Sequence, residues 1–185
     1  EDIPAKGYKV VPVPEVSPGV TVDEAGRRME NDYVRVVFDG NYNISSIYDK
    51  VSGREAIKEG EAGNRLTAFE DIPRAWDAWE ITNYYTEKYW HLDEVSGVRV
   101  IRDGETAGFE ITRPFQRSVV IQRVTLDAHT GKIDFDTKID WKNDHILLKA
   151  AFPTDITAEK AVYEIQYGSV ERPTHYNTSW EQAKF

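Results

Sequence analysis

Two stretches of the sequence gather side chains that could bind a sugar. In residues 70–80 two indoles, Trp76 and Trp79, flank Asp77, and Pro73 interrupts any strand before them. An indole presents an apolar ring face to the C–H groups of a hexose, and a carboxylate accepts hydroxyl protons. The same residues could instead form a structural loop, with buried indoles and with Asp77 closing a turn. Residue chemistry leaves both interpretations open.

The second stretch, Gln166–Trp180, is rich in hydrogen-bonding and aromatic side chains and contains no apolar run. Connecting segments of this length without secondary structure tend to be functional or disordered. The alternative is a crossover whose polar groups satisfy one another. We therefore take it as a second candidate binding segment.

Carboxylates recur at alternate positions of Ile133–Trp141, as Asp134, Asp136 and Asp140, which places them on one face of one strand. Glycosidases use a pair of carboxylates. Alternation with apolar residues is, however, also the pattern of any solvent-facing strand. With Lys138 on the same face, we favour a solvent-facing strand and expect no catalytic residue here.

The four histidines, His91, His129, His145 and His175, are scattered along the chain. A zinc site needs several nitrogen or oxygen ligands at short, repeated spacing. We therefore expect no metal site and no cofactor within this segment. The sequence has neither a Gly-x-Ser-x-Gly motif nor a glycine-rich phosphate loop.

The composition narrows the classes of partner. The 23 basic and 32 acidic residues give a net charge of -9, which argues against nucleic acid and against a membrane surface, because both select a basic face. No run approaches the roughly 18 apolar residues that span a bilayer. The chain has no cysteine, which excludes disulfides and thiolate sites and fits a reducing compartment, so we expect a cytoplasmic location.

The hydrophobic pattern predicts one strand after another from Asn31 onward. Alternating β-branched and aromatic residues indicate the strands, and Asp39-Gly40 and Asp103-Gly104 supply turns. The expected strands cover residues 33–38, 43–49, 66–70, 97–102, 109–112, 119–126, 133–141, 146–152 and 163–167. Helical periodicity is nearly absent, the best candidate being a turn at residues 179–185. We predict an all-β, antiparallel β-sandwich over residues 26–185, after an extended connector or edge strand over residues 1–25.

Four segments, in the same order, resemble one protein family. They are ENDYVRVVFDGNYNISSIYDKVSGREAI (Glu30–Ile57), NRLTAFEDIPRAWDAWEI (Asn64–Ile81), DWKNDHILLKAAFPTDI (Asp140–Ile156) and YEIQYGSVERPTHYNTSWEQAKF (Tyr163–Phe185). All four resemble the C-terminal portion of the α-mannosidases of glycoside hydrolase family 38. The similarity is greatest to the branch that contains cytosolic, vacuolar and bacterial enzymes.

The resemblance implies a part of a retaining exo-α-mannosidase. In that family an N-terminal α/β barrel carries the aspartate nucleophile and a zinc ion, and β-sandwich domains of the galactose-mutarotase type follow. By this resemblance the chain is a non-catalytic supersandwich domain that stops before its last strands. Zinc would belong to the parent catalytic domain, and the partners would be mannose-containing glycans and that catalytic domain.

The resemblance also suggests which residues contact the substrate. The loop after the early strands of relatives reaches the mouth of the barrel and helps to shape the sugar site. Carried over to this sequence, the candidates for this rim are Glu70, Trp76, Asp77 and Trp79, with Arg172, His175 and Tyr176 as weaker candidates. Two alternatives remain, a stand-alone carbohydrate-binding β-sandwich with the two indoles as its platform, and a mutarotase-like isomerase, which no residue spacing supports.

Overall fold

The computed structural model describes residues 19–76 and 79–178. The chain forms two compact units, the first ending at Thr154 and the second beginning at Asp155. The predicted helical turn at residues 179–185 lies outside the described residues. No helix in the described part of the chain is long and apolar enough to cross a membrane.

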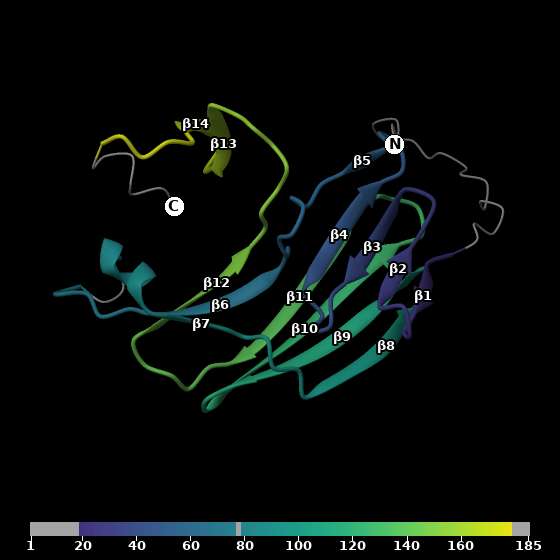
Figure 1. Cartoon of the computed structure of the whole chain (residues 1–185), viewed down its shortest axis with the longest axis horizontal. Helices are drawn as coiled ribbons and strands as arrows, with labels where there is room; N and C mark the ends of the chain where they lie inside the picture. The colour runs from purple at the N-terminus through teal and green to yellow at the C-terminus, as the bar shows by residue number, and fades with distance from the viewer. Residues whose placement is uncertain (1–18, 77–78, 179–185) are drawn as a thin grey trace, which may run out of the picture. The chain divides into compact units, whose positions relative to one another are not determined.

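The described residues form strands and one short 3-10 helix, η1 (Figure 1). The elements are β1 (Thr21–Asp23), β2 (Arg28–Glu30), β3 (Val34–Phe38), β4 (Ile44–Asp49), β5 (Arg54–Glu55), β6 (Arg65–Glu70), η1 (Asn83–Glu87), β7 (Tyr89–His91), β8 (Gly97–Asp103), β9 (Thr106–Phe115), β10 (Ser118–Asp127), β11 (Ile133–Asp140), β12 (Ile146–Ala151), β13 (Lys160–Ile165) and β14 (Gly168–Pro173). All strand pairs are antiparallel.

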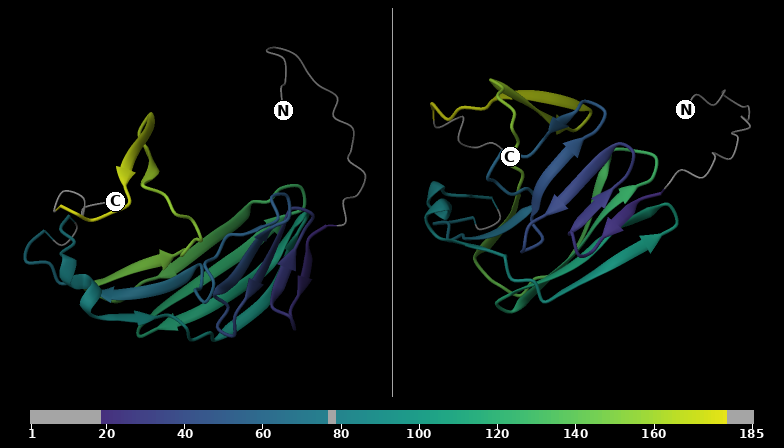
Figure 2. Two further views of the ribbon diagram at one scale, coloured as in Figure 1. Left: turned by 45° about the horizontal axis from the view of Figure 1, so that its top comes forward. Right: turned by 45° about the vertical axis from the view of Figure 1, so that its right-hand side comes forward.

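The first unit contains three sheets (Figure 2). The five-stranded sheet has the order β1-β2-β3-β4-β5, the four-stranded sheet β11-β10-β9-β8, and the three-stranded sheet β12-β6-β7. The four-stranded sheet follows the sequence pattern closely. Its β8–β9 hairpin closes after Asp103 with Gly104 at φ +56, a backbone conformation that glycine adopts without steric cost.

The five-stranded sheet packs face to face on one half of the four-stranded sheet. Met29, Val36 and Phe38 of the former meet Phe109 and Leu126 of the latter in a common apolar core. The rings of Phe38 and Phe109 meet edge to face with their centroids 5.4 Å apart, the geometry that aromatic quadrupoles favour. This packing confirms the predicted antiparallel β-sandwich.

The three-stranded sheet covers the other half of the same four-stranded face. Leu66 and Ala68 of β6 contact Phe115 and Val120 in a second core, and Trp141 stacks on Phe115 with an interplanar angle of 12°. Strands β9 and β10 are 10 residues each, which makes them long enough to support both cores. The second unit is a hairpin of β13 and β14.

The structure differs from the sequence-based expectations at the short elements. Strands β2, β5, β7 and β14 and helix η1 were not predicted, whereas β1 lies in the segment expected to be a connector or edge strand. The candidate binding segment Gln166–Trp180 is not wholly irregular, because β14 occupies part of it and pairs with β13. The division of the chain at residue 25 stays a prediction.

Candidate functional site

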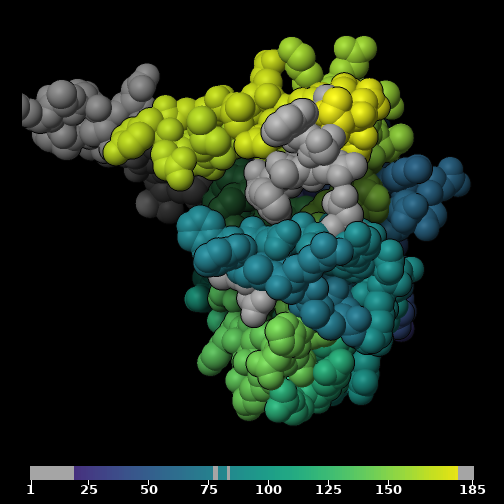
Figure 3. All heavy atoms as spheres, turned by 90° about the vertical axis from the view of Figure 1, so that its left-hand side faces the viewer, coloured from purple at the N-terminus to yellow at the C-terminus, as the bar shows by residue number. Residues whose placement is uncertain are grey.

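The loop between β6 and β7 carries the tryptophans of the first candidate segment. Its strand pairing ends where the N–H of Asp71 donates to the carbonyl oxygen of His145 at 2.8 Å. Pro73 then follows, and it has no N–H with which to continue the ladder. Figure 3 shows the teal side chains of this region on the surface that faces the viewer.

Both tryptophans project into solvent from one turn. The carbonyl oxygen of Trp76 accepts the N–H of Trp79 at 2.7 Å and that of Glu80 at 2.9 Å. Trp76 has φ +61, which is costly for a residue with a side chain. The side chains of Trp76 and Trp79 are 76% and 86% exposed, so neither indole is the buried plug that was the structural alternative. Asp77 lies outside the described residues.

Glu70 stands at the base of this loop, paired with a cation. Its carboxylate accepts a charge-assisted hydrogen bond from the Lys88 ammonium, and its backbone N–H donates to the carbonyl oxygen of Lys88 at 2.9 Å. The structure thus connects Glu70 to the beginning of β7.

An open pocket of about 390 Å³ lies beside the start of the loop. Its lining residues are Asp71, Pro73, Asp144, His145 and Ile146. The buried Oδ1 atom of Asp71 has no hydrogen-bond partner among the described protein atoms, which leaves a lone-pair site for a hydroxyl or a water. His145 has φ +54 and turns the chain into β12.

The three weaker candidates all lie in the second unit. Arg172 is on β14, with its guanidinium carbon 5.9 Å from the centroid of the Tyr163 ring. His175 and Tyr176 follow β14 and are exposed. The hydroxyl of Thr174 donates to the carbonyl oxygen of Ala158 at 2.7 Å and anchors the start of this segment.

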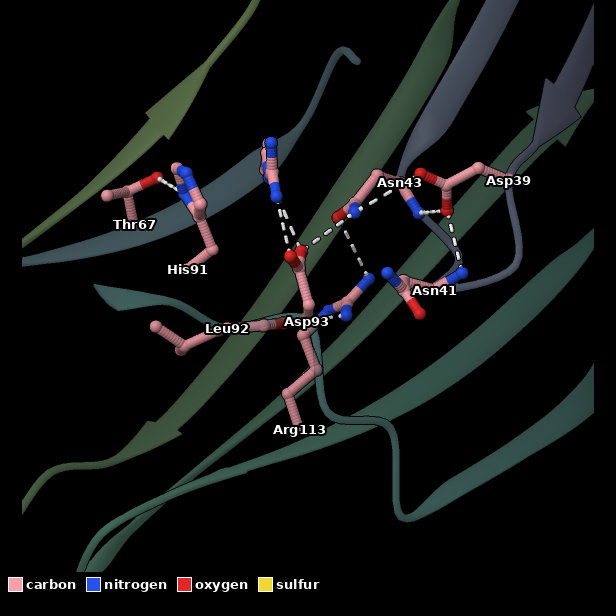
Figure 4. Close-up of polar contacts among 9 residues, drawn as sticks. Asp39, Asn41, Asn43, Thr67, His91, Leu92, Asp93 and Arg113 are labelled. Carbon is pink, nitrogen blue, oxygen red and sulfur yellow. Dashed lines mark hydrogen bonds and ion pairs between the residues drawn. The ribbon is translucent and has the colours of Figure 1, made fainter. Parts of the chain in front are cut away.

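A second group of side chains, which the sequence did not predict, lies on the three-stranded sheet. Strand register places Thr67 opposite His91 and Phe69 opposite Tyr89. Thr67 Oγ1 and His91 Nδ1 are 3.0 Å apart, within hydrogen-bond distance (Figure 4). Alternation in a strand puts these residues on the face opposite the apolar core. Because Thr67 and His91 are 24 residues apart in sequence, only the register brings them together.

A buried polar network joins the sheets behind this face (Figure 4). Arg113 is 1% exposed and donates to the carbonyl oxygens of Leu92 at 2.8 Å and Tyr42 at 3.0 Å. Burial lowers the pKa of Arg113, and Asp93 and Asp39 oppose that shift. The network ties the end of β7 to the β3–β4 turn.

Asp93, which follows β7, supplies a negative charge to the same network. It accepts hydrogen bonds from Arg65 at 2.6 Å and from Asn43 at 3.1 Å. Burial raises the pKa of Asp93, but the hydrogen bonds from these two donors outweigh it and hold the pKa below its ordinary value. Asp93 is therefore an anion that holds the sheets together, and it pairs with Arg65 while the neighbouring His91 pairs with Thr67.

Comparison with known proteins relates this architecture to a family. A model of the C-terminal domain of glycosyl hydrolases family 38 matches residues 29–185. Human alpha-mannosidase 2C1 is 34% identical over 99% of this chain, and alpha-mannosidase G of Dictyostelium discoideum is 35% identical over 85% of it. The chain spans 19% of the human protein's length and 15% of the Dictyostelium protein's.

Solved structures agree on the fold. The crystal structure of an alpha-mannosidase from Enterococcus faecalis V583 superposes with a TM-score of 0.68 at 17% identity, over 90% of this chain and 22% of that one. By sequence and by fold, the chain belongs to the glycosyl hydrolases of family 38 and corresponds to their C-terminal domain.

Proposed function

We propose that the chain is the non-catalytic β domain of a retaining exo-α-mannosidase that removes terminal α-linked mannose from glycans. The curated relatives are α-mannosidases, and the chain spans 19% and 15% of the length of the two compared above. The hydrolytic machinery would then reside in the remainder of the parent protein. The parent protein would be cytoplasmic, and the lack of cysteine in this chain is consistent with a reducing compartment.

The residues described here do not fit a zinc site. Over residues 19–76 and 79–178, no group of three His, Asp or Glu side chains could hold a metal ion. A zinc ion would belong to the parent's catalytic domain.

The exposure of Trp76 and Trp79 carries the proposal. Each indole can bury about 150–250 Å² against a partner, and contiguous exposed apolar surface marks interaction sites. Ile72 adds a third exposed apolar side chain, 63% exposed, to the same loop. In the proposed role this loop, with Glu70 and Asp77, contacts the terminal mannose at the rim of the active site and supports the catalytic barrel.

Arg172, His175 and Tyr176 are weaker contributors in this proposal. His175 and Tyr176 are exposed and Arg172 is partly exposed, and the hydrogen-bonding capacity of the three side chains suits contact with a glycan or with the catalytic domain. Alanine substitutions here should change the kinetics of the parent enzyme less than substitutions in the β6–β7 loop.

The same two exposed indoles support a second candidate, a stand-alone carbohydrate-binding module. The two functions differ in what the isolated chain can do. A module binds mannose on the two indoles by itself, whereas on a rim domain the β6–β7 loop offers only part of a site and binds mannose weakly or not at all.

Activity and calorimetry together test the proposal. The isolated chain should hydrolyse 4-nitrophenyl α-D-mannopyranoside at the background rate, while the full-length parent protein hydrolyses it. Hydrolysis by the isolated chain that resists chelation would contradict the non-catalytic role. Calorimetric titration of the chain with mannose separates the two candidates, because a clear binding isotherm lost in Trp79→Ala would favour the module.

A further inference from the structure

The outer face of the three-stranded sheet carries an aromatic and polar cluster that includes neither Trp76 nor Trp79. We define the sheet-face cluster as Thr67, Phe69, Tyr85, Tyr89, His91 and Lys149. Five of the six stand on β6, β7 and β12, and η1 contributes Tyr85. Register aligns Lys149 with Thr67 on one side and His91 with Thr67 on the other, so the strand residues share one face.

The rings of this cluster form a continuous row. The Phe69 centroid lies 5.2 Å from that of Tyr85 and 5.9 Å from that of Tyr89. The Tyr89 centroid is in turn 5.1 Å from that of His91. Tyr89 is 52% exposed although two ring neighbours, Phe69 and His91, pack against it. A ring held in place yet open to water is a ready stacking surface.

Hydrogen-bonding groups border the row and are oriented by their neighbours. The Lys149 ammonium donates to the Tyr85 hydroxyl at 2.9 Å and lies 4.9 Å from the centroid of the Tyr85 ring. Lysine has three donors and this contact uses one of them. Because the Tyr85 oxygen accepts, its own proton remains available to donate outward.

His91 adds a further polar group beside Tyr89. Its Nδ1 atom is 3.0 Å from Thr67 Oγ1, and the imidazole is exposed. A hydrogen bond at Nδ1 fixes the orientation of the ring, so Nε2 is the nitrogen free to meet a ligand.

We propose that the sheet-face cluster binds a neutral pyranose. The Tyr89 face would take the apolar C–H side of the sugar, and Lys149, Tyr85 and His91 Nε2 would bind its hydroxyls. Rings bordered by a few oriented polar groups are the usual composition of a small-ligand site. The chain's net charge of -9 favours a neutral ligand over an anionic one. This site uses neither Trp76 nor Trp79 and would hold whether or not the parent protein hydrolyses mannosides.

Nuclear magnetic resonance titration of the whole 185-residue chain with methyl α-D-mannopyranoside tests the proposal. Saturable shifts of backbone amides in β6, β7 and β12 are expected. Tyr89→Ala should weaken binding by about tenfold or more, the usual scale for an aromatic contact, and Lys149→Ala should weaken it as well. Tyr89→Phe, which keeps the ring, should bind like the wild type.

Tyr167→Ala is the matched control, because it removes an aromatic ring exposed in the β13–β14 turn. It should leave this titration unchanged. Trp79→Ala reports separately on the β6–β7 loop, so a failure of this site and a failure of the rim role remain distinguishable. Thermal unfolding checks that each variant is folded. Absence of saturable shifts in the wild type, or binding that survives both Tyr89→Ala and Lys149→Ala, would overturn the proposal. Binding lost only in Trp79→Ala would place the sugar on the loop and overturn it too.

Discussion

The N–H of Trp79 donates to the carbonyl oxygen of Trp76 at 2.7 Å, so both exposed indoles leave the chain from a single turn. That turn requires φ +61 at Trp76. The cost of holding a large residue in this conformation is about 1 kcal/mol or more. Trp76 therefore has a strained backbone conformation, and the first unit does not bury its side chain. Strain of this kind is typical of residues whose side chains serve a binding site.

Replacing Trp76 by glycine should relieve this strain. We expect Trp76→Gly to keep the free energy of unfolding or raise it by up to about 1 kcal/mol, although a large aromatic residue is lost. Urea denaturation measures the change. Trp79→Gly is the control, because Trp79 is equally exposed but has no positive φ, and it should be neutral or slightly destabilising. A clear loss of stability in Trp76→Gly would contradict the exposed, strained turn.

Arg113 should be among the most sensitive polar positions of the first unit. Arg113→Met leaves the buried carbonyl oxygens of Leu92 and Tyr42 without their donors. We expect a loss of about 2–4 kcal/mol, measured by urea denaturation. Arg117→Met, at a side chain that is 69% exposed, should change stability little. Equal effects of the two substitutions would mean that Arg113 does not join the sheets.

The four-stranded sheet leaves no room for a side chain at Gly108. A Cβ atom there would lie 1.9 Å from the carbonyl oxygen of Val124 on β10. Gly108→Ala should therefore separate β9 from β10 and cost about 1–3 kcal/mol, as overpacking does. Gly97→Ala is the control, since its Cβ would come no closer than 3.9 Å to Thr112. Thermal unfolding of the two variants checks the difference, and an unperturbed Gly108→Ala protein would refute the close approach.

The ionisation of Glu110 should make the free energy of unfolding depend on pH in the acid range. Hydrogen bonds from Arg99 at 2.5 Å and Arg123 at 2.8 Å lower the pKa of Glu110 from 4.5 to about 2. A carboxyl group whose pKa is lower in the folded state stabilises that state at pH values above its unfolded-state pKa. This stabilisation is lost as the pH falls from about 4.5 to about 2. The stability difference between wild type and Glu110→Gln should shrink over that range in unfolding measured at several pH values. A difference that stays constant down to pH 2 would contradict the assignment.

The longer strands could be predicted because their side chains alternate. Strand β10 buries every second residue, and β9 does so from Phe109 onward. This period can be read from the sequence. Strand β7 could not be predicted, because Tyr89, Trp90 and His91 are all ring-bearing and show no polar and apolar alternation. Helix η1 has only 5 residues, too few to show helical periodicity in the sequence.

The candidate site likewise has features that could be predicted from the sequence and features that could not. Trp76 and Trp79 are close in sequence, and their exposure on a loop is compatible with the composition of that segment. The Thr67–His91 pair instead depends on the register of β6 against β7, which composition does not specify. His91 and Asp93 are two residues apart in sequence, yet the structure gives each a different partner.

Steady-state kinetics of the full-length parent protein with Trp79→Ala test the rim role most directly. We predict that kcat/KM for 4-nitrophenyl α-D-mannopyranoside falls about tenfold or more, while the melting temperature of the isolated variant chain stays at the wild-type value. Tyr167→Ala, which removes an aromatic ring exposed in the β13–β14 turn, should leave kcat/KM unchanged. Wild-type kinetics in Trp79→Ala would contradict a role for this loop at the active-site rim.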